Sequence, residues 1–165
     1  MTWITGVANA AMGIAIEKGR FTYEQAIKKE RFEDASEVAQ TIIKLWENEY
    51  ASHKEFPKDI PFDDIDRNAL SIWYFSAAFA EAKLGNNDTA ENYLQKAIKF
   101  DETNGEAHLL LSQIAKDDET KKIAIANTFN KGSNVRFGSL MEIMNLNDKK
   151  EENTKEMPYM GRGVL

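Results

Sequence analysis

The run from Ser71 to Ala115 constrains the fold most, because it places small residues where two helices would have to cross. Its apolar residues recur at helical spacing, and Gly85 lies between two such segments. Helices that cross closely need a small side chain at the crossing point and larger side chains on either side. Ala90 and Ala97 provide the small side chains of the second segment, and Leu94 provides a large one between them. The run therefore predicts antiparallel helical hairpins and an all-α fold.

The same run resembles the tetratricopeptide repeat (TPR), a helical hairpin that holds other proteins. The family places an aromatic, a large apolar and a small residue on the first helix, then a glycine turn and contact alanines on the second. The packing positions that match this pattern, or repeat it a second time, are Tyr74, Ala78, Gly85, Ala90, Leu94, Ala97, His108, Leu111 and Ser112. The first copy departs from it at two positions, since Ala77 stands where a large apolar residue is usual and Glu102 replaces a proline. The second copy has Glu119 in place of the turn glycine and Lys131 in place of the later alanine. The resemblance implies one well-matched and one degenerate hairpin, stacked as a short TPR-like α-solenoid.

A single helical domain is expected over residues 1–146. Its predicted parts are divergent N-terminal helices at 1–52, a Pro-containing connector at 53–62, TPR-like repeats at 63–131 and a capping helix at 136–146. The stretch 147–165 begins as a charged, apolar-poor segment and is expected to be a flexible tail. Because repeat arrays need about three units, either the N-terminal helices or a second subunit must pack on the first repeat.

Three helices are expected in the N-terminal part. The first covers 2–18 and ends near Gly19, and a weaker one follows at 21–32. A third begins near Asp34 or Ser36, either of which suits a helix N-cap. Its predicted buried stripe consists of Val38, Ile42, Leu45, Trp46 and Tyr50.

The expected helix at 2–18 is rich in Gly and Ala and is therefore thin. Thin helices allow a neighbour to approach closely, which suits a packed core, a self-associating helix or a membrane contact alike. The segment is shorter than the roughly 18 to 20 apolar residues that span a bilayer. Residues 2–18 are thus expected to pack inside the protein, to contact a membrane, or to be the remnant of a longer targeting region.

Composition excludes several functions. The formal net charge is −6 and no basic stripe appears, so nucleic acid is not an expected partner. The chain has no Cys and only two His, and its carboxylates are not paired on one helix face. We therefore expect no catalytic residues, no metal and no cofactor, and an enzyme ranks as a distant third function.

The resemblance also implies a binding groove, lined by the first helix of each hairpin. Its expected residues are Ile72, Phe75, Phe79, Lys83, Leu109, Gln113 and Lys116. TPR proteins that grip a free carboxylate carry Lys and Asn where this chain has Phe75 and Phe79, so the groove is expected to be apolar. An apolar groove suits an amphipathic helix or a hydrophobic peptide. Alternatively, the helix at 38–50 covers both rings.

The first expected function is a non-catalytic protein–protein interaction module, an adaptor or scaffold subunit that binds a partner helix or peptide through its TPR-like surface. The alternative is an assembly component, membrane-associated or self-oligomerising, held by the Gly/Ala-rich helix at 2–18. The expected partners are another protein or peptide, or further copies of the same chain. The expected location is the cytoplasm, with membrane association as the alternative.

Overall fold

The computed structural model describes the backbone of residues 2–53, 64–132, 142–143 and 146, and the side chains of 12–48, 67–132, 142, 143 and 146. These residues form six helices and contain no strand. The helices are α1 (Thr2–Lys28), α2 (Phe32–His53), α3 (Asp64–Lys83), α4 (Asn87–Phe100), α5 (Gly105–Ile114) and α6 (Asp118–Asn130). The prediction of an all-α fold is confirmed.

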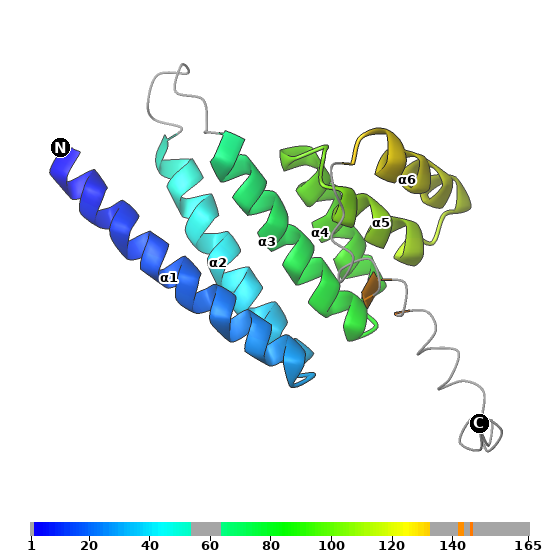
Figure 1. Cartoon of the computed structure of the whole chain (residues 1–165), viewed down its shortest axis with the longest axis horizontal. Coiled ribbons are helices and arrows are strands. Elements are labelled where there is room, and N and C mark those ends of the chain that lie inside the picture. The colour runs from blue at the N-terminus through cyan, green and yellow to red at the C-terminus, as the bar shows by residue number, and fades with distance from the viewer. Residues whose placement is uncertain (1, 54–63, 133–141, 144–145, 147–165) are drawn as a thin grey trace.

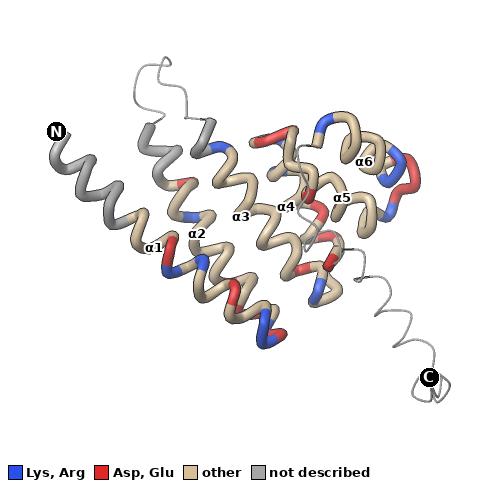
Figure 2. The backbone as a smooth tube through the Cα atoms, in the orientation of Figure 1, with Lys and Arg blue, Asp and Glu red and all other residues tan. Residues whose placement is uncertain are grey.

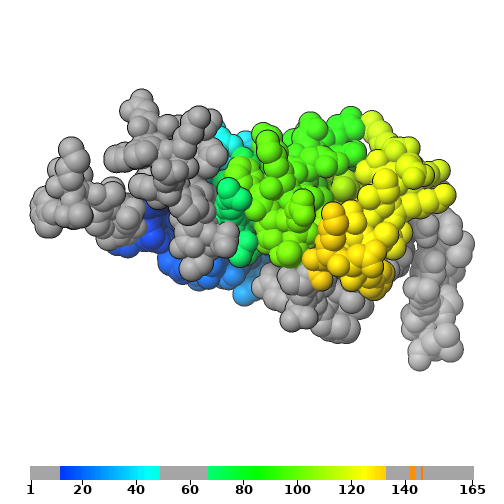
Figure 3. Space-filling view, turned by 90° about the horizontal axis from the view of Figure 1, so that it is seen from above, coloured from blue at the N-terminus to red at the C-terminus, as the bar shows by residue number. Residues whose placement is uncertain are grey.

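The helices follow one another in a row, and each packs on the next one in chain order (Figure 1). The space-filling view shows the same succession along the long axis, from blue α1 to yellow α6 (Figure 3). In addition, α3 touches α5. The N-terminal helices therefore pack on the α3–α4 hairpin within one chain, which is the first of the two predicted arrangements.

α1 is longer than the sequence predicted. One helix runs through Gly19 to Lys28, so the predicted end near Gly19 and the separate helix at 21–32 are wrong. Gly19 is buried where α1 meets α2, and a Cβ atom at this position would lie 2.7 Å from Ile42 Cδ1. The glycine thus permits a close approach of two helices and does not end one. The turn comes later, where Glu30 has a φ of 55°.

α2 begins at Phe32, so the predicted start near Asp34 or Ser36 is wrong. Ser36 does not cap the helix, because its hydroxyl donates a hydrogen bond of 2.6 Å to Oε1 of the buried Glu81 in α3. Oε2 of the same carboxylate accepts one of 2.8 Å from Asn86 Nδ2 in the α3–α4 turn. A buried carboxylate is costly unless it is hydrogen-bonded, so these contacts fix α2, α3 and the turn together.

The buried face of α2 differs from the predicted stripe, because among the described side chains of the stripe Ile42 alone is buried, while Ala35, Ser36, Ala39 and Ile43 are buried without having been predicted. Leu45 is exposed, whereas Ile43 is buried beside Ile42. Val38 and Trp46 are half-buried, and the side chain of Tyr50 lies outside the described residues.

The α3–α4 hairpin holds the centre of the core. Eight of the nine predicted packing residues are buried, namely Tyr74, Ala78, Ala90, Leu94, Ala97, His108, Leu111 and Ser112. The ninth, Gly85, has a φ of 84° in the turn, a conformation that favours glycine. The Ser71 hydroxyl donates a hydrogen bond of 2.7 Å to the carbonyl of Ala97 and so joins the two helices. Most of α3 carries no charge, whereas charged residues gather in the α1–α2 and α5–α6 turns (Figure 2).

The predicted capping helix at 136–146 lies within the described residues only at Glu142, Ile143 and Leu146. These three residues have helical backbone, and both Ile143 and Leu146 are buried in the main core cluster. The predicted connector at 53–62, apart from His53, and the predicted tail at 147–165 lie outside the described residues.

Candidate functional site

A hollow of about 650 Å³ lies between α1, α3 and the start of α5. Its apolar wall includes Tyr23 and Ile27 from α1 and Ile72, Phe75 and Phe79 from α3, and these five residues define the α1–α3 groove. Trp73 and Ile143 complete the apolar lining. Charged residues of both signs surround it, namely Arg20, Glu24, Lys28, Asp101, Glu106 and Glu142. An apolar floor with a polar rim is the usual form of a binding site.

Three of the predicted groove residues lie together in this hollow. Ile72 is 56% exposed, Phe75 is half-buried, and Phe79 is only 5% exposed. The rings of Phe75 and Phe79 lie 6.2 Å apart between centroids. Access therefore increases along α3 from Phe79 toward Ile72, and Ile72 is the most accessible of the three.

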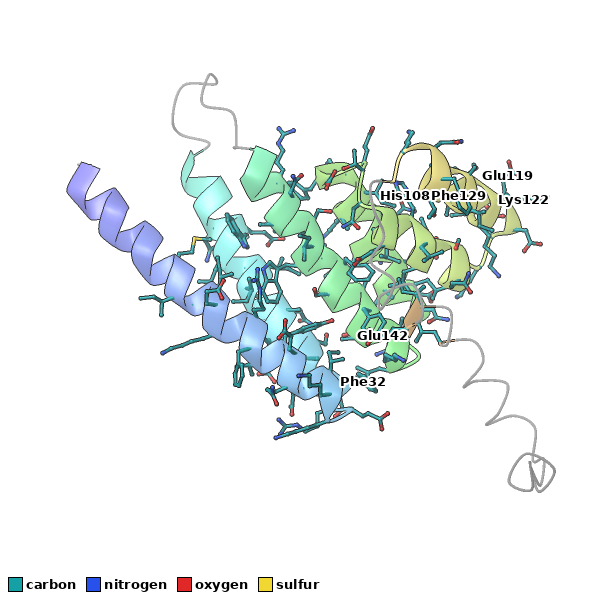
Figure 4. The ribbon with its side chains drawn as sticks, in the orientation of Figure 1. Phe32, His108, Glu119, Lys122, Phe129 and Glu142 are labelled. Atoms are coloured by element: carbon teal, nitrogen blue, oxygen red, sulfur yellow. The ribbon has the colours of Figure 1, made fainter. Side chains whose placement is uncertain are left out.

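Lys83 lies at the end of α3, where its ammonium group is 5.4 Å from the ring centroid of Phe79 and 5.8 Å from that of Phe32. A cation above an aromatic face is attracted by the ring quadrupole. Phe32 begins α2, so Lys83 joins the end of α3 to the α1–α2 turn, where Phe32 is labelled in Figure 4.

The other three predicted groove residues do not line the α1–α3 groove. Leu109 packs partly buried against the core. Gln113 Nε2 lies 3.5 Å from Ser112 Oγ, and Lys116 pairs with Asp88 of α4 at 2.8 Å. In place of these residues, α5 contributes Gly105 and Glu106 to the lining.

Sequence reasoning missed the wall that α1 contributes. Tyr23 and Ile27 are four residues apart, so they share one face of the helix. The Tyr23 hydroxyl donates a hydrogen bond of 2.8 Å to the Ser76 carbonyl, and its ring meets Trp73 edge-on at 6.1 Å. The four-residue spacing was visible in the sequence. Nothing in it showed that this face meets α3.

Two tyrosines near the interfaces of α3 have perturbed acidity. Burial raises the pKa of Tyr23 above its ordinary value of 10.0, and the nearby Glu142 carboxylate raises it further. Burial also raises the pKa of Tyr74, whose hydroxyl donates a hydrogen bond of 2.5 Å to Glu47 Oε1 in α2. Both phenols are therefore neutral donors at ordinary pH.

The hollow combines an apolar wall with charged side chains at its edge. Among the described side chains, no three His, Asp or Glu residues gather as a candidate metal site. His108 is buried, and its Nε2 lies 2.8 Å from the carbonyl of Glu102. The α1–α3 groove is thus suited to holding an apolar surface.

Comparison with models of protein families, with curated proteins and with solved structures found no match. Within the described ranges, none of the helices combines the length and the apolarity needed to cross a membrane. The segment predicted to pack or to contact a membrane, residues 2–18, forms the first part of α1, and the side chains of 1–11 lie outside the described residues.

Proposed function

We propose that this protein is a non-catalytic interaction module, an adaptor or scaffold subunit that binds an amphipathic helix of a partner protein in the α1–α3 groove. The exposure of Ile72 carries the proposal. This aliphatic side chain is 56% exposed inside a hollow that also contains Phe75. Apolar side chains gathered in a concave site with a polar rim are typical of surfaces that another molecule covers.

The order of the helices supports a TPR-like arrangement. The pairs α1–α2, α3–α4 and α5–α6 follow one another as three hairpins, which is about the number that a repeat array needs. The groove is lined by α1, α3 and α5, the first helix of each pair. In proteins that the sequence resembles, the first helices line the binding face, so the groove lies where that family would place a ligand.

A helix is the favoured ligand because Ile143, a residue with helical backbone, already lies against this surface. Ile143 is fully buried. Ile143 lines the hollow together with Phe75 and Phe79. The groove thus accommodates an aliphatic side chain presented by a helix, which is the anchor that an amphipathic partner helix would supply.

The test compares Ile72→Asp with Ile123→Asp. Ile123 lies on α6 and is 52% exposed, so the two variants add the same charge at similarly exposed positions. Each full-length variant and the wild type is immobilised, and proteins captured from cells of the source organism are quantified by mass spectrometry. We expect one set of proteins to be retained by the wild type and Ile123→Asp and lost from Ile72→Asp. Equal capture by all three would refute the proposal.

Exposed side chains on α1 favour self-association as a second candidate function. Ile14 and Phe21 are largely exposed and lie seven residues apart, hence on one face of the helix. α1 is also the first helix of the row, so this face has no helix of the described chain beyond it (Figure 1). Sedimentation velocity tests this candidate, because Phe21→Asp would convert a dimer into a monomer. A wild type that is monomeric at high concentration would exclude it.

A further inference from the structure

We propose that the partner helix in the α1–α3 groove is basic along one side of its apolar stripe, and that this side meets an acidic edge of the groove. The acidic edge consists of Asp101, Glu106 and Glu142, which all line the hollow. This inference rests on the proposed function of the groove. It names the chemistry of the partner, an amphipathic helix with Lys or Arg beside its apolar residues.

The two sides of the hollow differ in charge. On the side of α1, Arg20, Glu24 and Lys28 carry both signs. On the other side, Asp101 follows α4 and Glu106 lies in the first turn of α5, and α3 lies between this side and α1 (Figure 1). Among the described residues that line the hollow, none after Lys28 in the chain is Lys, Arg or His. A bound helix would therefore face lining residues of mixed charge on one side and of negative charge on the other.

Glu142 adds a third carboxylate to the acidic edge. Its side chain is exposed, and Figure 4 shows it beside α3. The carboxylate also lies near enough to the Tyr23 phenol to raise the pKa of that group. Glu142 therefore brings negative charge close to the apolar wall, where it would attract a cation on a bound helix.

Local contacts hold two members of the acidic edge in place. Asp101 Oδ1 accepts hydrogen bonds from the backbone N–H of Thr103 at 2.9 Å and from its hydroxyl at 2.6 Å. These neutral donors orient the carboxylate. Glu106 is half-buried in the first turn of α5, where the positive end of the helix dipole favours a carboxylate. The acidic edge is thus formed by the fold itself, before any partner binds.

The apolar wall and the acidic edge have different effects on binding. Ile72, which is 56% exposed, offers apolar contact to any amphipathic helix. Apolar contact is non-directional, so it does not distinguish one such helix from another. Charges at the rim do distinguish them, because opposite charges favour association and like charges oppose it. A helix with Glu beside its apolar stripe would face the carboxylates of the acidic edge, whereas a helix with Lys would pair with them.

The test uses two fluorescent synthetic peptides of about 18 residues, long enough to form a helix. Both carry the same stripe of Leu at helical spacing, and they differ only along one side of it, which is Lys in one peptide and Glu in the other. The affinity of each peptide for the full-length wild type is measured by anisotropy. We expect the Lys peptide to bind about tenfold more tightly, since several exposed charge pairs each contribute a small factor. This preference should shrink as NaCl rises from about 0.05 M to about 0.5 M. Equal affinities, or no binding of either peptide, would overturn the proposal.

Matched variants locate the preference at the acidic edge. Glu106→Gln/Glu142→Gln removes two of its charges and should reduce the preference at least about threefold. Glu37→Gln/Glu119→Gln changes the net charge by the same amount at exposed residues that do not line the hollow, and should keep the full preference. Circular dichroism establishes that each variant keeps its helical signal. If the first variant loses it, Glu142→Gln alone takes its place, with the same direction of change expected. Equal loss of preference in both double variants would assign the effect to net charge and overturn the proposal.

The peptide assay and the capture assay fail separately. Ile72→Ser removes apolar contact without adding a charge, so it should weaken binding of the Lys peptide, and unchanged binding would place the peptide outside the groove and overturn the proposal. Captured proteins that depend on Ile72, together with equal affinities of the two peptides, would leave the groove a binding site and remove only its charge preference. A preference for the Lys peptide that depends on the acidic edge and on Ile72, without any captured protein that depends on Ile72, would support the charge preference and remove the proposed function.

Discussion

The Phe79→Ala variant tests whether Phe79, a residue of the groove wall, also belongs to the hydrophobic core. The ring is 5% exposed and contacts a hollow of about 650 Å³ on one side. Truncating a buried Phe to Ala costs about 3–5 kcal/mol, of which part reflects the cavity that is left. Because the new space would join an existing hollow, we expect the low end, about 3 kcal/mol. This loss in the free energy of unfolding is larger than the loss expected for a residue that only lines the groove. It is the loss expected for a ring that contributes to both packing and binding.

The assay is urea unfolding followed by circular dichroism at equilibrium. With a slope of about 2 kcal/mol per molar urea, the midpoint should fall by roughly 1.5 M. Phe129→Ala is the matched control, since this ring on α6 is 83% exposed and its loss should change the free energy of unfolding by less than about 0.5 kcal/mol. A loss below about 1 kcal/mol for Phe79→Ala, or one equal to that of Phe129→Ala, would refute the assignment of Phe79 to the core.

Three further predictions concern polar contacts. Ser36→Ala removes the 2.6 Å hydrogen bond to the buried Glu81 carboxylate, so urea unfolding should show a loss of about 1–3 kcal/mol, and an unchanged midpoint would contradict the role given to this contact. The Asn104 side chain caps α5, because its Oδ1 accepts from the Ala107 backbone N–H at 3.0 Å, and its Nδ2 donates a hydrogen bond of 2.9 Å to the buried Ser71 Oγ. Asn104→Ala removes both contacts and should cost about 2 kcal/mol in the same assay, whereas Asn104→Asp keeps the cap acceptor, loses the donor to Ser71 and should cost about 1 kcal/mol. The raised pKa values of Tyr23 and Tyr74 mean that the unfolded chain loses these protons first as pH rises above about 10, so stability that is present below pH 10 should fall above it. Replacing both tyrosines by Phe should make the fall of the urea midpoint shallower between about pH 9 and 11, the range around an ordinary tyrosine pKa. Burial also raises the pKa of Tyr93, so part of the fall should remain. An equally steep fall in the variant would assign the whole effect to other groups.

The α3–α4 hairpin was predictable because its determinants are local. Ala90, Leu94 and Ala97 repeat at helical spacing within one segment, and all three are fully buried. Gly19 shows where local reasoning failed. A glycine in a helical pattern fits both a helix end and a close helix crossing, and the choice depends on Ile42, which is distant in sequence.

The candidate site was predictable only along α3. Ile72, Phe75 and Phe79 are spaced for one helix face and follow from the sequence. The wall that faces these residues does not follow from the sequence, because Tyr23 precedes α3 in the chain and Ile143 follows it. Neither residue is near α3 in sequence, so no periodicity within α3 indicates them.

The central claim, that the α1–α3 groove holds a partner helix, is tested most directly by site-specific photocrosslinking. A photoreactive phenylalanine analogue replaces Ile72 in one full-length variant and the similarly exposed Ile123 in another, and both are irradiated inside cells. We expect position 72 to crosslink to a partner protein within an amphipathic helical segment and position 123 not to do so. If position 72 yields no crosslinked protein, or if both positions yield the same proteins, the groove does not hold a partner helix.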